Sequence, residues 1–367
     1  MRFFKLSPGP LLPLLCFVLL GASPSRVSAQ AQQAPLTNEE FLQLVRQIPK
    51  DPGARSQIIE ALRRRGIAFP LTAGLRSVVA TKSGNDADLR RALEEAERRR
   101  LNPSAAAVLP TEAEAADVLA RARAAAAEAS EQMPDFVVKQ LVTRAHAQGT
   151  TRNWTTSDRL VVAVSFRVHG GEQYRLLAVN GVPGAGDGRE AGSYEQAGGA
   201  TSTGEFVSVL AQLFREESKT EFKAVDTDTI GSRRTLVYEY RVKRPNSKQT
   251  ISAAGAERIT TGHGGRLWID RENARVLRIV SDAEAADIPA AYPVRAARRR
   301  IDYDWVNIAE RPYLLPSRSV VEMTVAQAGR HFQSRNDIRF RNYQKFGTEI
   351  KVIEEDIVED EPVEKKP

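Results

Sequence analysis

The residue types that most often carry enzymatic chemistry are sparse in this chain and show no catalytic spacing. The 367 residues include one cysteine and four histidines, which are His146, His169, His263 and His331. No two histidines are spaced as His-x-x-x-His and no carboxylates cluster beside them, so a zinc site is not indicated. No Gly-x-Ser-x-Gly motif marks a serine nucleophile. We therefore predict no catalytic residue, no metal ion, no cofactor and no enzymatic activity.

Two polar residues near position 265 have a structural interpretation. His263 lies within Thr261-Gly-His-Gly-Gly265, where a turn between two strands accounts for it. Asp270 follows Leu267-Trp-Ile and precedes Arg-Glu-Asn. Because Asp and Asn commonly cap turns, we expect Asp270 to hold a turn together.

A glycine-rich stretch suggests a phosphate-binding loop at first sight. Residues 181–204 contain eight glycines. Gly184-Ala-Gly186-Asp-Gly188 does not match the dinucleotide fingerprint, and no Gly-Lys-Ser/Thr follows it. We interpret the stretch as a loop.

Aromatic and apolar side chains are better candidates for a binding surface. One face of a curved sheet looks into a concave space, and a row of aromatic residues there would form an apolar ligand site. Packing in the core is the alternative for each of them. The predicted ligand-binding residues are Phe206, Leu210, Phe214, Tyr238, Tyr240, Trp268 and Trp305.

A long series of strands must position these residues. From Phe136 onward, segments with period-two alternation are separated by short links rich in Gly, Asn and Asp, which is typical of antiparallel neighbours. About ten strands in one meander predict a sheet that is curved or nearly closed. The expected strands begin at Phe136 and then lie near 157–168, 172–179, 221–226, 235–242, 248–252, 265–270, 274–281, 300–308, 317–325 and 331–343.

One helix interrupts the strands. Residues 204–216 are amphipathic, with an apolar stripe, and Ser202 and Glu205 have the spacing of a capping box. A helix that crosses between strands must bury such a stripe on the sheet. We expect it to cover the concave face, either as a lid or as a fixed plug.

The region before the strands is helical. Residues 36–100 predict four short helices, in which Thr37 to Glu40 fits a capping box. We interpret Arg63–Arg65 and Arg98–Arg100 as solvated helix ends, not as a nucleic-acid surface. Residues 101–133 are rich in alanine and form a linker helix, or one that lies along the next domain.

The N-terminus has the pattern of a removable signal peptide. Arg2 and Lys5 precede an apolar run from Leu11 to Leu20, and Val27-Ser-Ala29 suits a signal peptidase. Cleavage after Ala29 would remove the only cysteine and leave 50 basic against 46 acidic residues, a net charge of +4. We expect an exported protein, periplasmic or secreted, that has no disulfide and is not integral to a membrane.

The strand region resembles the periplasmic lipoprotein-carrier superfamily of the LolA and LolB type, with the related RseB-type sensors. Gly264-Gly-Arg-Leu-Trp-Ile-Asp270 and Arg275-Val-Leu-Arg-Ile279 carry the resemblance, which covers roughly 134–345. Ile301-Asp-Tyr-Asp-Trp-Val306 and Tyr313-Leu-Leu-Pro316 complete the pattern. The resemblance implies an unclosed β-barrel whose hydrophobic mouth is covered by helices.

The sequence thus predicts an α+β protein whose main unit is a large antiparallel, curved sheet, an unclosed β-barrel with a covering helix. The expected division is 1–29 signal peptide, 36–100 helical module, 101–133 alanine-rich linker helix, 134–345 half-barrel and 346–367 charged tail. The leading hypothesis is non-enzymatic binding of a lipid, lipoprotein or similar amphiphile in the half-barrel. The alternative is an envelope protein that contacts other proteins, or a sensor module without a small ligand; no nucleic-acid partner is expected.

Overall fold

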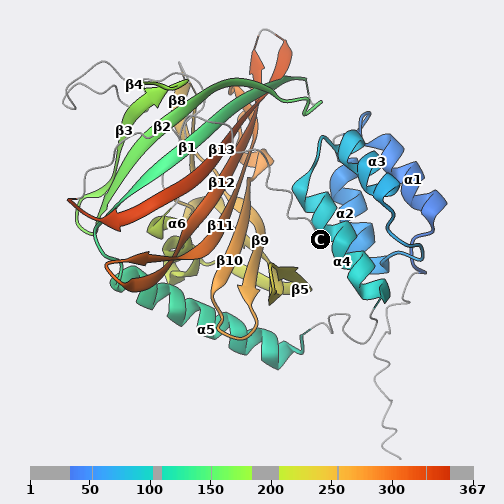
Figure 1. Ribbon diagram of the computed structural model, residues 1–367, viewed down its shortest axis with the longest axis horizontal. Helices are drawn as coiled ribbons and strands as arrows, with labels where there is room; N and C mark the ends of the chain where they lie inside the picture. The colour runs from blue at the N-terminus through green and yellow to red at the C-terminus, as the bar shows by residue number, and fades with distance from the viewer. Residues whose placement is uncertain are drawn as a thin grey trace, which may run out of the picture.

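The chain folds into a small helical bundle beside a large twisted sheet (Figure 1). The computed structural model describes residues 34–51, 53–101, 110–149, 151–183, 206–253, 256–327 and 329–347. The predicted signal peptide, the capping box at Ser202 and Glu205, and nearly all of the charged tail lie outside these residues. No helix in the described ranges is long and apolar enough to cross a membrane.

Four helices form the bundle, as the sequence predicts for residues 36–100. Thr37 caps the first helix, because its hydroxyl accepts from the Glu40 amide at 3.2 Å while the Glu40 carboxylate accepts from the Thr37 amide at 2.9 Å. Asp86 caps the fourth by accepting from the Leu89 amide at 2.9 Å. The apolar side chains of the bundle form one cluster of their own. The helices are α1 (Asn38–Gln47), α2 (Ala54–Arg65), α3 (Ala73–Ser83) and α4 (Ala87–Leu101).

The alanine-rich helix α5 (Glu112–Glu131) lies along the sheet. The Thr111 hydroxyl caps it by accepting from the Glu114 amide at 3.2 Å. Val118 and Ala122 are buried in the same apolar cluster as side chains of the sheet. Of the two roles that the sequence left open, packing against the next domain is the one observed.

The sheet has eleven antiparallel strands and is not closed into a barrel, as predicted. Consecutive strands pair for most of its width, and β13 returns to pair with β1. The edges are β4 and β5, so the barrel is open between these two strands. The strands of this sheet are β1 (Phe136–Gln148), β2 (Thr155–Arg167), β3 (Gly171–Val179), β4 (Val182–Pro183), β5 (Glu221–Ile230), β6 (Arg233–Val242), β9 (His263–Asp270), β10 (Val276–Ala283), β11 (Val294–Ile308), β12 (Arg311–Gln327) and β13 (Arg330–Lys345).

One predicted strand lies outside the main sheet. The segment expected near 248–252 is β7 (Thr250–Ala253), which pairs with β8 (Ala256–Thr260) in a separate two-stranded sheet. This hairpin falls between β6 and β9 in the chain, and so β6 pairs with β9 directly. The meander is therefore interrupted there.

The short helix α6 (Val207–Phe214) occupies the interval between the two edge strands in the chain. It packs against α5 and against the apolar face of the sheet, with Leu213 buried in the same cluster as Tyr238. In Figure 1 α6 lies within the curve of the strands. The expected covering helix is thus present, and we call the sheet face that α5 and α6 cover the inner face.

Candidate functional site

The inner face is apolar because strand alternation directs every second side chain toward the helices. On β6, Leu236, Tyr238 and Tyr240 are buried in one cluster with Leu267 and Ile269 of β9. A second cluster continues across β1, β2, β12 and β13 and contains Phe136 and Phe340 among others. The two clusters together form the floor of the open barrel.

Two of the predicted site residues, Tyr238 and Tyr240, lie on this floor. The Tyr238 hydroxyl donates to the Ala115 carbonyl of α5 at 2.8 Å, and burial raises the pKa of Tyr238 to about 12. Burial also raises the pKa of Tyr240, whose ring lies 6.0 Å from that of His263, centroid to centroid. Both phenols are therefore neutral, and Tyr238 fixes α5 to the sheet.

The predicted residues near α6 are placed at different depths. Phe206 is buried, and its ring lies 5.3 Å from both Phe136 and Phe340. Leu210 and Phe214 are only half-buried, and Phe214 stacks on Phe222 of the edge strand β5 at 5.6 Å. The helix therefore has one deeply inserted aromatic side chain and a partly exposed apolar stripe.

The structure does not bring Trp268 and Trp305 to the inner face. Trp268 is buried on the opposite side of β9, where its indole N–H donates to Asp228 at 2.9 Å and the guanidinium of Arg278 lies 5.7 Å from its ring. Trp305 is 40% exposed. On β11 the buried positions change parity after Tyr303, and this removes Trp305 from the face that the alternation predicts.

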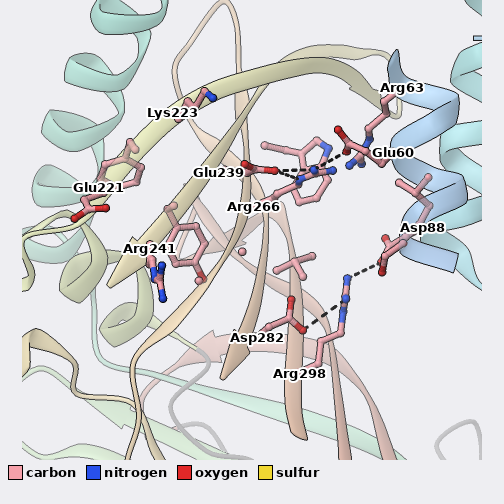
Figure 2. A pocket seen from close by; sticks show the side chains of 18 of the residues that line it. Glu60, Arg63, Asp88, Glu221, Lys223, Glu239, Arg241, Arg266, Asp282 and Arg298 are labelled. Carbon is pink, nitrogen blue, oxygen red and sulfur yellow. Dashed lines mark hydrogen bonds and ion pairs between the residues drawn. The ribbon is translucent and has the colours of Figure 1, made fainter. Parts of the chain in front are cut away.

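A cavity of about 540 Å³ lies between the helical bundle and strands β5, β6, β9, β10 and β11 (Figure 2). It faces mainly the outer side of the sheet and also reaches Phe222 and Tyr240 of the inner-face cluster. We call it the bundle–sheet cavity. Its lining is mostly charged, with both signs interspersed. The lining residues are Ser56, Ile59, Glu60, Arg63, Asp88, Glu221, Phe222, Lys223, Glu239, Tyr240, Arg241, Gly264, Gly265, Arg266, Trp268, Val280, Asp282, Glu284 and Arg298.

Two arginines of the sheet bridge this cavity to the bundle. Arg266 contacts Glu60 of α2 at 3.2 Å and Glu239 of β6 at 2.7 Å. Arg298 contacts Asp88 of α4 at 3.2 Å and Asp282 of β10 at 3.6 Å. Figure 2 shows both bridges as dashed lines. The bundle is thus held over the outer face by ion pairs.

The pKa values of the two carboxyl groups beside Arg298 shift in opposite directions. Burial alone would raise the pKa of Asp88, but the guanidinium groups of Arg298, Arg91 and Arg300 outweigh it and lower that pKa. Burial raises the pKa of Asp282, and Arg298 offsets this only in part. Asp88 is therefore the firmly ionised partner of the bridge.

The interpretation of the two arginine runs as solvated ends is partly wrong. Arg63 and Arg99 both pair with Asp226 of β5, at 3.3 and 2.9 Å, and their side chains are only 15% and 18% exposed. Arg64, in contrast, is solvent-exposed. A run of like charges cannot show from its sequence which member meets a carboxylate on a distant strand.

Neither site, as far as the described residues go, is arranged to hold a metal ion. Within the described ranges, no three His, Cys, Asp or Glu side chains are arranged to hold one. Asp270, as expected, holds a turn by accepting from the Glu272 amide at 2.9 Å, and it pairs with Arg233 at 2.8 Å. The chemistry available is apolar contact on the inner face and paired charge in the bundle–sheet cavity.

Comparisons with known proteins identify no family for this chain. No family model matches it, and no curated protein matches it. Among solved structures, a DUF1329 family protein from Desulfovibrio piger is similar, with 9% identity, a TM-score of 0.28, and coverage of 63% of this chain and 95% of that one. A putative outer membrane lipoprotein-sorting protein domain from Vibrio parahaemolyticus has 14% identity, a TM-score of 0.25, and coverage of 63% and 93%.

A third similar structure is the MucA/MucB complex of Pseudomonas aeruginosa, with 11% identity, a TM-score of 0.16, and coverage of 61% and 93%. The lipoprotein-sorting domain belongs to the group that the sequence resemblance named.

Proposed function

We propose that this protein is exported and binds, without chemistry, the acyl chain of a lipid, lipoprotein or similar amphiphile on the inner face of its open barrel. One observation carries the proposal. The apolar floor is covered at the open side of the barrel by a helix whose stripe is half-buried, instead of by a paired strand. An acyl chain could take the place of Leu210 and Phe214 without breaking any hydrogen bond between strands.

Replacing Leu210 and Phe214 together by Ala tests this proposal. We expect the affinity for a fluorescent fatty-acid probe to rise at least about tenfold, because these two side chains occupy the place that the acyl chain would take. The melting temperature should fall only modestly, since both side chains are half-buried. Titration of the probe measures the affinity, and thermal unfolding of the same samples measures the melting temperature.

Leu213→Ala is the matched control, because Leu213 lies on the same helix but is 3% exposed. Truncating a buried leucine costs about 2–5 kcal/mol of unfolding free energy, so this variant should lose more stability than the double variant. If the unaltered protein binds no probe, and native mass spectrometry of the purified protein detects no lipid, acyl-chain binding is wrong.

The charged bundle–sheet cavity favours a second candidate function, contact with another envelope protein through the outer side of the molecule. Its paired charges suit a polar partner and not an acyl chain. A lipid detected by native mass spectrometry would favour the first function, and a partner lost on mutation of Glu60 and Asp88 would favour the second.

A further inference from the structure

Two polar side chains on the inner face have no partner for their hydrogen-bonding groups. Gln140 of β1 and Ser319 of β12 are both fully buried. Within the described part of the chain, the Nε2 and Oε1 atoms of Gln140 make no hydrogen bond, and the Oγ atom of Ser319 makes none either. Leaving such a group unsatisfied destabilises the folded protein, so these residues require an explanation beyond packing.

Strand register places both side chains in the apolar floor. Gln140 alternates with Val138 and Val142, which point into the floor, and it is paired with Phe340 of β13. Ser319 is paired with Ile338 of β13 and with Ile301 of β11, both of which also point inward. The two polar residues therefore lie on opposite sides of β13, with Gln140 opposite Phe340 and Ser319 opposite Ile338, the neighbouring inward position.

The residue before α6 covers this place. The Phe206 ring lies 5.3 Å from that of Phe340, the residue paired with Gln140. Phe206 directly precedes α6, whose stripe is half-buried. A movement of α6 away from the sheet would withdraw the ring and open the floor beside Gln140.

The chemistry of the unpaired atoms restricts what can bind there. A glutamine amide presents donors on Nε2 and an acceptor on Oε1, and a serine hydroxyl both donates and accepts. A ligand group that satisfies Gln140 must therefore donate as well as accept. An amide or a hydroxyl does so, an ester only accepts, and a plain alkyl chain does neither.

We propose that Gln140 forms a polar subsite for an amide or hydroxyl group carried on the acyl chain of the ligand, and that Ser319, on the far side of β13, is a second polar point along the same chain. The proposal rests on the proposed function and specifies which class of amphiphile the inner face selects. The inner face would then combine apolar contact along the chain with directed hydrogen bonds to Gln140.

Competition binding with chains of equal length tests the subsite. Dodecanamide and methyl dodecanoate are each used to displace a fluorescent fatty-acid probe from the purified protein. Because each hydrogen bond contributes about 0.5–1.5 kcal/mol net, we expect the amide to bind about tenfold more tightly than the ester. Gln140→Leu should abolish this difference, and the amide should lose more affinity than the ester, because the ester can only accept from Gln140 whereas the amide both donates and accepts.

Thermal unfolding supplies an independent readout. Gln140→Leu removes an unsatisfied buried amide and keeps a similar volume, so we expect its melting temperature to rise. Ser319→Ala should act in the same direction with a smaller effect. Gln173→Leu on β3 is the matched control, since Gln173 is exposed and its replacement should change neither selectivity nor melting temperature.

Each contrary result identifies what is wrong. Equal affinity for amide and ester in the unaltered protein overturns the subsite but leaves acyl-chain binding standing. Binding of neither chain, nor of the probe, overturns the proposed function as well. A fall in the melting temperature of Gln140→Leu would show that the amide is satisfied in the folded protein, for example by a buried water, and would also overturn the subsite.

Discussion

His263 is a half-buried imidazole at the start of β9 whose surroundings oppose protonation. Burial and the guanidinium of Arg299 lower its pKa to about 4. In the unfolded chain the pKa is about 6.5, so the unfolded state takes up a proton first as the pH falls. Stability that is present at neutral pH is therefore lost between about pH 6.5 and pH 4.

We expect this loss to be about 2 kcal/mol of unfolding free energy, after allowance for partial solvent access. Denaturant unfolding at pH 7 and pH 4.5 measures it. His263→Gln should lose less stability than the unaltered protein over this range, whereas His146→Gln, at an exposed histidine, should lose the same amount. If the unaltered protein and His263→Gln lose the same unfolding free energy between pH 7 and pH 4.5, the loss does not come from His263.

Individual residues also show how far the sequence predicts the site. Period-two alternation correctly places Tyr238 and Tyr240 on the apolar face, since β6 is regular across both positions. It fails for Trp305 because the alternation of β11 shifts after Tyr303, and no residue type announces that shift. Gln140 was missed because a single polar residue in a strand has no distinctive pattern before the strand's neighbours are known.

Among the secondary-structure elements, the pairing of β9 with β10 explains the second of the two glycines, Gly265, in the motif that carries the family resemblance. A Cβ atom on Gly265 would lie 2.0 Å from the Val280 carbonyl oxygen, far inside van der Waals contact. The two strands can approach as they do only because this side chain is absent. The motif therefore has a structural basis, apart from any role in binding.

Gly265→Ala should consequently destabilise the protein, by about 3 kcal/mol or more, because backbone must move to admit the methyl group. Gly74→Ala is the matched control: it lies in α3, its Cβ would meet nothing closer than 4.0 Å, and it should stabilise the helix by about 0.5–1 kcal/mol. Denaturant midpoints of both variants decide the matter. A Gly265→Ala variant as stable as the unaltered protein would mean that the close strand approach is not maintained in solution.

The sequence predicts where helices and strands lie better than it predicts which strands pair with each other. Caps at Thr37, Asp86 and Thr111 mark the starts of helices, and alternation marks most strands, since both signals are local. The pairing of β13 with β1 is not local, nor is the exclusion of β7 and β8 from the main sheet. Those features depend on contacts between residues far apart in the chain.

At the scale of the whole molecule, the bundle and the sheet meet through charge. The apolar core of the bundle is separate from the two clusters of the inner face. Arg152 with Asp86 at 3.3 Å and Arg99 with Asp226 at 2.9 Å add to the bridges across the cavity. Many of these charged side chains are largely buried, and the cost of removing them from water offsets much of the attraction between them, so the ion pairs add little net stability. The sequence could not predict the cavity, because docking of the bundle creates it.

The ionic contact leads to a prediction about domain boundaries. Because the bundle has its own core and α5 shares its core with the sheet, we expect limited proteolysis to cut within 102–109 and to leave a stable fragment that begins before α5. The boundary that the structure favours is therefore near residue 110 and not near 134.

A fragment spanning 110–347 should fold with the antiparallel sheet intact. A fragment spanning 134–347 lacks Val118, Ala122 and the carbonyl that accepts from Tyr238, and it should be less stable by several kcal/mol. Circular dichroism and thermal unfolding of the two fragments make the comparison. If the 110–347 fragment aggregates or stays unfolded, the bundle contributes to the folding of the sheet and the two parts form one cooperative unit.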